Sequence, residues 1–155
     1  MKKQRIYIDT SVIGGCFDDE FCLWSQKLIA DFKNYIYFPV VSEVTEAEIS
    51  DAPQQVITEY KKIISFGAEK LSITEEAYEL AETYQEREIL TPKFFDDGLH
   101  IAIATIAEID IVVSWNFKHI VHFDKIRKFN SVNREFGYKS IEIYSPREVA
   151  TDENI

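Results

Sequence analysis

Short apolar runs alternate with segments of helical periodicity along most of the chain. The apolar runs have the length of buried strands and lie at residues 5–9, 35–41, 71–73, 111–115 and 141–144. Helices are expected at residues 21–33, 43–51, 53–66 and 95–107. A further helix is expected to begin after Thr74, which suits the N-cap position. The helix at 95–107 is apolar nearly all round, so it must be deeply buried. Segment 10–19, which contains Gly14 and Gly15, is expected to be a loop.

This alternation of strands and helices predicts an α/β sandwich. The 155 residues suit one domain with a single core, expected over residues 1–150 with a short tail at 151–155. No apolar stretch is long enough to span a bilayer, and the start of the chain does not resemble a signal peptide. Cys16 and Cys22 lack the spacing of a metal site or redox motif. These features predict a cytoplasmic protein with two reduced thiols.

The charge of the chain is strongly acidic, with a net value of −10 and a pI near 4.8. Phosphate binding normally relies on Lys and Arg, although carboxylates that hold a divalent cation also attract phosphate. Residues 117–139 are basic, whereas residues 43–88 are acidic. The basic residues are Lys118, Lys125, Arg127, Lys128, Arg134 and Lys139. They form either a basic lip over an acidic pocket or an ordinary solvated helix face.

Acidic or amide side chains follow several of the predicted strands. Asp9 closes the first apolar run, Glu48 lies seven residues past the second, and Asn116 directly follows the run at 111–115. Asp97 stands at the start of the apolar helix. In a parallel sheet the carboxyl ends of the strands converge on one edge, where ligands bind. Oxygen ligands gathered there would suit Mg²⁺ or Mn²⁺.

Each of these positions also has a structural interpretation. Asp9 can cap a loop, and Thr10 and Ser11 can orient its carboxylate or bind a metal-bound water. Asp96 and Asp97 both suit the positive end of a helix dipole. Helical geometry places Asp97 on the face that approaches the sheet. Asp96 is turned about 100° away from that face and is the expected helix cap.

The remaining candidates are less specific. Glu46 and Glu48 compete for one place in an acidic helix whose side chains can simply face solvent, and Glu43 is a weaker candidate. Asn116 is also a common turn residue. His100 is either a buried core histidine or a hydrogen-bond partner of Asp97 or of substrate. A zinc site built on His119 and His122 is disfavoured, because no third close ligand is present.

Four segments in this order resemble the PIN-domain family, and most closely its branch of VapC-type toxins. The first two are Tyr7-Ile8-Asp9-Thr10-Ser11-Val12-Ile13 and Ser42-x-x-Thr45-x-x-Glu48-Ile49. The other two are Asp97-Gly98-Leu99-His100-Ile101-Ala102-Ile103-Ala104 and Val112-Val113-Ser114-Trp115-Asn116. The stretch from Trp115 to Ile120 also resembles a PIN subgroup with a Trp-Asn-x-x-His-Ile signature.

The resemblance implies a PIN-like three-layer α/β/α sandwich with a central, mainly parallel sheet. It also implies an endoribonuclease that uses Mg²⁺ or Mn²⁺, with Asp9, Glu48 and Asp97 on the family's acidic metal-binding positions. Asn116 falls where many members have Asp, and it is the fourth expected catalytic residue. The resemblance also implies that residues near these positions support the site or contact the substrate: Thr10, Ser11, His100, Lys118 and His119.

The resemblance further implies an RNA substrate, a homodimer and the toxin half of a type II toxin–antitoxin pair. A basic segment of the antitoxin would pair with the acidic cleft. An alternative is a PIN-fold module that binds RNA or protein with weak or no catalysis, which the acidic charge and Asn116 favour. A DNA nuclease or a phosphatase with similar site chemistry is a third possibility.

Overall fold

The computed structural model describes residues 2–152 and contains a central five-stranded sheet in the order β3-β2-β1-β4-β5. All four strand pairs are parallel. The strands are β1 (Arg5–Ile8), β2 (Phe38–Ser42), β3 (Glu69–Leu71), β4 (Ile111–Val113) and β5 (Glu142–Tyr144). The helices are α1 (Thr10–Gly15), α2 (Cys22–Lys33), α3 (Glu43–Ser50), α4 (Gln54–Ser65), α5 (Glu75–Glu86), η1 (Pro92–Phe94), α6 (Phe95–Ile106), α7 (Phe123–Glu135) and α8 (Pro146–Val149).

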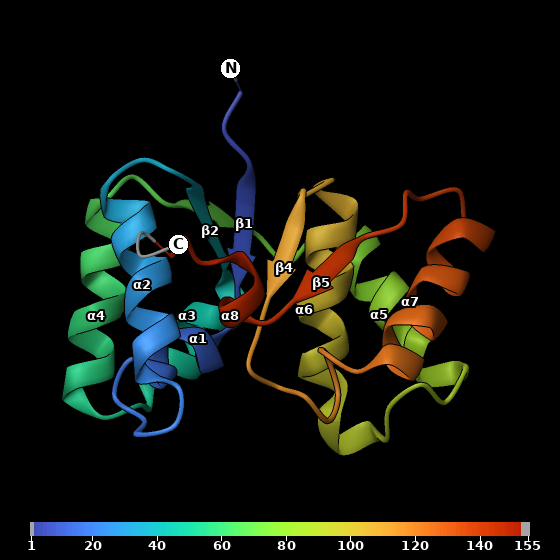
Figure 1. Cartoon of the computed structure of the whole chain (residues 1–155). Coiled ribbons are helices and arrows are strands. Elements are labelled where there is room, and N and C mark those ends of the chain that lie inside the picture. Colours follow the sequence, from blue (N-terminus) through green and yellow to red (C-terminus); the bar gives the residue numbers. More distant parts are fainter. Residues whose placement is uncertain (1, 153–155) are drawn as a thin grey trace.

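Successive residues of a strand face opposite sides of the sheet, so the three central strands, β2, β1 and β4, contribute to two hydrophobic cores. Tyr7 and Val112 pack into the core formed with α5, α6 and α7. Ile6, Ile8 and Val113 pack into the core formed with α1, α2 and α4. Helices therefore cover both faces of the sheet, as Figure 1 shows. The predicted three-layer α/β/α sandwich with a parallel sheet is confirmed.

The loop predicted at 10–19 is wrong in its first half, because α1 begins directly after Asp9. Val12 and Ile13 of this helix are fully buried in the core. A glycine is needed at position 15 because neighbouring side chains pack closely against its backbone, and not because the chain turns there. A Cβ atom built on it would lie 2.6 Å from Ser25 Oγ and 2.7 Å from Trp115 Nε1. The two glycines are therefore a misleading loop signal.

The structure also differs from the prediction in the bounds of β2 and β3 and in the presence of helix α7, which has no strong apolar pattern. β2 starts at Phe38 rather than at residue 35, because Tyr35 has a φ of 58° and so cannot extend the strand. β3 lies two residues earlier than expected. The basic segment carries helix α7, whose buried face is narrow and formed by Phe129, Val132 and Asn133. The five helices that were predicted match α2, α3, α4, α5 and α6 to within a few residues.

Both cysteines are free thiols, as predicted. Among the helices of residues 2–152, none is long and apolar enough to cross a membrane. The last three residues of the tail expected at 151–155 lie outside the described residues.

Candidate functional site: an acidic cluster at the sheet edge

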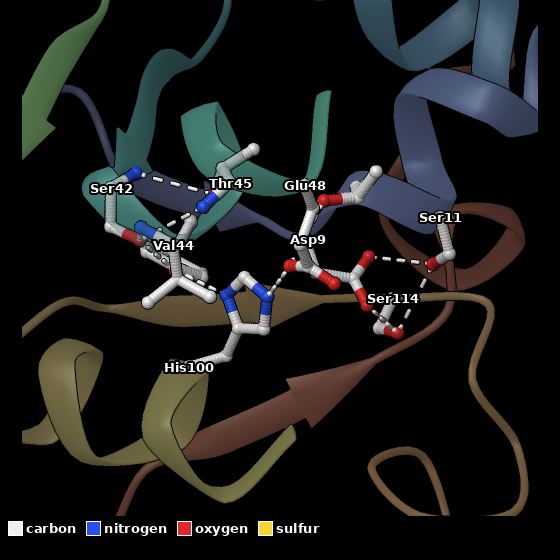
Figure 2. Close-up of polar contacts among 10 residues, drawn as sticks. Asp9, Ser11, Ser42, Val44, Thr45, Glu48, His100 and Ser114 are labelled. Atoms are coloured by element: carbon white, nitrogen blue, oxygen red, sulfur yellow. Dashed lines mark hydrogen bonds and ion pairs between the residues drawn. The ribbon is translucent and has the colours of Figure 1, made fainter. Parts of the chain in front are cut away.

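Asp9 is held at the carboxyl end of β1 by two serine hydroxyls. Because β1 pairs with β4, Ser114 at the end of β4 comes next to Asp9. Its Oγ donates to Asp9 Oδ2 at 2.6 Å, and Ser11 Oγ donates to Asp9 Oδ1 at 2.6 Å. Figure 2 shows both hydroxyls pointing at the carboxylate. The role of Ser11 in orienting Asp9 was predicted, whereas that of Ser114 was missed.

The two serines are themselves oriented by the loop that follows β4. The backbone N–H of Trp115 donates to Ser11 Oγ at 2.9 Å. The backbone N–H of Asn116 donates to Ser114 Oγ, also at 2.9 Å. Each hydroxyl thus accepts from this loop and has its proton free for Asp9. The carboxylate of Asp9 is fixed through both of its oxygens.

Asp9 is almost completely buried, with 5% of its surface exposed. Burial raises the pKa of Asp9 above its ordinary value, and the negative charge of Glu48 adds to this effect. The nearby His100 ring and the two serine hydroxyls oppose the shift. The site therefore holds a carboxylate whose charge is not fully compensated by its neighbours.

Glu48 is half-exposed and is held by a chain of hydrogen bonds that continues into the buried core. Its Oε1 lies 2.6 Å from His100 Nε2 and accepts from Thr10 Oγ1 at 3.1 Å. The other ring nitrogen of His100 lies 2.5 Å from the hydroxyl of Tyr7, which lies 2.7 Å from Ser42 Oγ. Ser42 caps α3, the helix that carries Glu48. The start of α3 and its acidic residue are therefore tied to the same network.

Histidine 100 is the centre of this network, and its partner is Glu48 rather than Asp97. Burial of the ring opposes protonation, but Tyr7, Glu48 and Asp9 outweigh it and raise the pKa of His100 well above its ordinary value. Burial likewise opposes ionisation of Glu48, yet the hydrogen bonds from His100 and Thr10 lower the pKa of Glu48. Both shifts favour the charged forms of this pair, an imidazolium bonded to a carboxylate. His100 is therefore the buried histidine that was expected, whereas the expected bond to Asp97 is wrong.

Asp97 projects from the first turn of α6 and contacts His119. Its Oδ2 lies 3.1 Å from His119 Nδ1, and the His119 ring packs on Phe94 with centroids 3.8 Å apart. Burial raises the pKa of Asp97, and the charge of Asp9 adds to it, while His119 and His100 oppose the shift. Asp9 and Asp97 therefore lie close enough to influence each other.

Two acidic residues next to these positions lie outside the cluster. Asp96 is exposed inside the first turn of α6, and the N-cap is Phe94, so the predicted capping role of Asp96 is wrong. The reason is that the turn η1 runs directly into α6 and starts the helix earlier. Glu46 accepts from Lys70 and Tyr60 on the surface, in agreement with its predicted surface role.

Asn116 stabilises the turn after β4. Its Oδ1 accepts from the backbone N–H of His119 at 2.9 Å, which is the typical role of Asn in a turn. This bond holds the loop that carries Lys118 and His119, of which His119 contacts Asp97. The side chain of Asn116 also hydrogen-bonds the Asp97 carboxylate and lowers the pKa of Asp97, so Asn116 serves the turn and borders the cluster.

The donor atoms of the cluster suit a hard divalent cation. Among residues 2–152, no group of three His, Cys, Asp or Glu side chains is arranged to hold a metal ion directly. Mg²⁺ usually keeps several waters and binds through only one or two carboxylates. A bound cation would also stabilise the charged forms of the buried Asp9 and the half-buried Asp97, whose pKa values are raised. The residues therefore fit a cation held largely through water.

The fold is that of PIN-domain proteins. No family model matches the sequence, and no curated protein sequence matches it. Solved structures of similar fold include VapBC2 from Rickettsia felis bound to a promoter DNA fragment, with 13% identity and a TM-score of 0.57 over 92% of this chain and 98% of that chain.

Two further solved structures share this fold. A toxin–antitoxin complex from Klebsiella pneumoniae has 12% identity and a TM-score of 0.57 over 77% of this chain and 93% of that one. The sarcin–ricin-loop-cleaving toxin VapC20 from Mycobacterium tuberculosis has 14% identity and a TM-score of 0.58 over 74% and 92%. At such identities the likeness establishes the fold alone.

Proposed function

We propose that this protein is an endoribonuclease that uses Mg²⁺ or Mn²⁺ to hydrolyse RNA phosphodiester bonds. The observation that carries the proposal is the meeting of Asp9, Glu48 and Asp97, from three separate elements, at one edge of the sheet. The ligand-binding edge of a parallel sheet is where such a site is expected. The fold shared with a toxin that cleaves the sarcin–ricin loop supports the same activity.

In this proposal Asp9, Glu48 and Asp97 hold the cation, in part through water. When bound, a divalent cation lowers the pKa of a water ligand and neutralises charge on the phosphate. The remaining residues hold these carboxylates in place: Ser11 and Ser114 for Asp9, His100 and Thr10 for Glu48, and His119 for Asp97. Lys118 is proposed to contact the phosphate, and Asn116 to position the loop that carries it.

We further propose that the protein is the toxin of a type II pair and acts as a homodimer in the cytoplasm. The shared fold with two antitoxin-bound toxin structures supports a cognate antitoxin. The uncompensated carboxylates would accept an arginine-rich segment of such a partner. Co-purification with the product of the neighbouring reading frame, and light scattering of the free protein, test these two points.

RNA cleavage by the purified protein tests the activity. Wild type is expected to cleave RNA with Mg²⁺ or Mn²⁺ and to stop when EDTA is added. Asp97→Asn should abolish cleavage, whereas Asp96→Asn provides a matched control, because that neighbouring carboxylate is exposed and lies outside the cluster. Equal residual cleavage by wild type and Asp97→Asn would assign the activity to a contaminant and refute the proposal.

The alternative function is a PIN-fold module that binds RNA or protein with little catalysis. It is favoured by the net charge of −10 and by the engagement of the Asn116 side chain in a backbone hydrogen bond. This module would retain RNA in a filter-binding assay in the presence of Mn²⁺ without cutting it. The Asp97→Asn variant would then bind RNA as well as wild type does.

A further inference from the structure

A cavity of about 630 Å³ lies next to the acidic cluster. It is formed by the end of α5, the loop and turn that lead into α6, the loop after β4 and the start of α7. Its volume is in the range of small-molecule binding sites. Its lining residues are Gln85, Glu88, Ile89, Leu90, Thr91, Pro92, Phe94, Lys118, His119 and Lys125.

The cavity and the acidic cluster share one side chain, His119. This residue lines the cavity, and its Nδ1 lies 3.1 Å from Asp97 Oδ2. Phe94, whose ring packs against His119, is also part of the wall. A molecule in the cavity would therefore be separated from Asp97 by a single imidazole ring.

The lining combines an apolar wall with positive charge. The wall is formed by Ile89, Leu90, Pro92 and Phe94. Two lysines, Lys118 and Lys125, line the cavity against one carboxylate, that of Glu88. This excess of positive charge stands out in a chain whose net charge is −10. An apolar face beside cationic groups is the combination that binds a nucleobase and its phosphate.

Lys125 is held in place at the cavity. Its Nζ donates to the backbone carbonyl of Ile89 at 2.6 Å, which leaves two further N–H groups for a ligand. The ammonium is therefore fixed at the end of the apolar wall rather than free in solvent. A phosphate next to it would find a positioned donor.

Gln85 provides a hydrogen-bonding group without a partner in the protein. Its Nε2 is buried and has no hydrogen-bond partner, the single such side-chain atom found among residues 2–152. Buried polar groups almost always have a partner, so an unpaired one needs an explanation. Rotation about the last side-chain torsion would turn this amide toward an acceptor in the cavity.

We propose that this cavity is a nucleotide subsite, which binds one unpaired RNA nucleotide next to the bond that is cut. The base lies on the apolar wall with the amide of Gln85 on its polar edge, and a phosphate lies at Lys118 and Lys125. The subsite rests on the proposed ribonuclease function, because His119 places the cavity beside Asp97. It would give the enzyme a preference for the base at that position.

Binding of the four nucleoside 5′-monophosphates to the full-length protein in EDTA tests the subsite, with NMR chemical shifts as the measurement. At least one monophosphate is expected to shift the signals of Gln85 and Phe94, and inorganic phosphate alone should not shift them. Gln85→Leu and Lys125→Met should each weaken this binding at least about fivefold. Gln55→Leu is the control, because Gln55 is exposed on α4. Thermal melts verify that all variants are folded.

The possible results separate the subsite from the ribonuclease function. Binding of no monophosphate, equal shifts with inorganic phosphate, or binding unchanged in both variants would overturn the subsite. If wild type cleaves RNA through Asp97 and Gln85→Leu matches it in binding and cleavage, the subsite alone is refuted. If monophosphates bind with the expected variant pattern and no RNA is cut, the subsite holds and the ribonuclease function fails.

Discussion

Ser11 and Ser114 donate hydrogen bonds of 2.6 Å to different oxygens of the same carboxylate, that of Asp9. One serine belongs to α1 and the other follows β4, so the pair links two parts of the chain that are distant in sequence. Residues that hold a metal-binding carboxylate contribute to metal affinity as well as to local order. The two serines are therefore expected to matter for activity although neither is a proposed metal ligand.

Replacement of either serine by alanine is expected to lower RNA cleavage about 10- to 100-fold, the usual effect of losing an outer partner of a metal ligand. Cleavage rates as a function of Mn²⁺ concentration check this, and the loss should be partly recovered at high Mn²⁺. Ser65→Ala is the control, since its hydroxyl is exposed and bonds only to Lys62 O among the described residues. Unchanged activity in both Ser11→Ala and Ser114→Ala would contradict the assigned roles.

His100 and Tyr7 occupy successive places in the buried chain that ends at Glu48, and their replacement should have different effects. His100→Leu removes the partner of Glu48 and is expected to reduce both cleavage and stability. Tyr7→Phe leaves that bond intact and should cost about 1–3 kcal/mol of unfolding free energy with a smaller effect on cleavage. Denaturant unfolding and cleavage rates measure the two effects. Cleavage by His100→Leu at the wild-type rate would show that Glu48 is not positioned through His100.

Gly15 and Gly14 form a matched pair that tests the packing beneath the site. A Cβ at Gly15 would clash with Ser25 and Trp115, whereas one at Gly14 would meet no atom within 4 Å. Gly15→Ala is expected to cost about 1–3 kcal/mol, the usual cost of overpacking. Gly14→Ala should stabilise the helix by about 0.5–1 kcal/mol. Urea unfolding measures both, and similar values for the two variants would refute the close approach.

The unfolding free energy of the metal-free protein is expected to fall as the pH rises above 3.8 and to continue falling above 6.5. The pKa values of Asp9 and Asp97 are raised above their ordinary value of 3.8, so the folded state binds more protons above that pH. The pKa of His100 is also raised, so its contribution to stability is fully present below 6.5 and is lost as the pH rises from there through the raised pKa. The lowered pKa of Glu48 acts in the opposite direction, but below 4.5.

Denaturant unfolding in EDTA at several pH values measures this dependence. Asp9→Asn should show a smaller decrease with pH than wild type, because it removes one of the groups that release a proton. Saturating Mn²⁺ should also reduce the decrease, because the cation stabilises the ionised carboxylates. A stability that rises with pH over this range would contradict the assignment of the raised pKa values.

The parallel sheet and its carboxyl-end acidic residues were predictable from local patterns. The apolar runs before Asp9 and before Ser114 can be recognised as buried strands from their composition and length alone. Helix α1 was not predictable in this way, because the close packing of Gly15 against Trp115 depends on residues 100 positions away. For the basic segment the sequence left a solvated helix face as one of two interpretations, and the bounds of α7 were not predictable because few of its residues are buried.

The partners of the site residues were harder to predict than the residues themselves. The spacing of three between Asp97 and His100 suggested a direct bond, yet the ring of His100 turns to Tyr7 and Glu48 on neighbouring elements. Asp97 instead meets His119, which comes from the loop after β4. Such pairings depend on tertiary packing, which periodicity along the chain does not contain.

Titration with Mn²⁺, followed by the electron paramagnetic resonance signal of the free ion, tests the central claim most directly. Wild type and Asp96→Asn are expected to bind Mn²⁺ with equal affinity, and Asp97→Asn and Asp9→Asn to bind it far more weakly. A melting temperature for each variant shows that the fold is intact. Absence of Mn²⁺ binding by folded wild-type protein, or equal binding by all four proteins, would contradict a metal centre formed by these carboxylates.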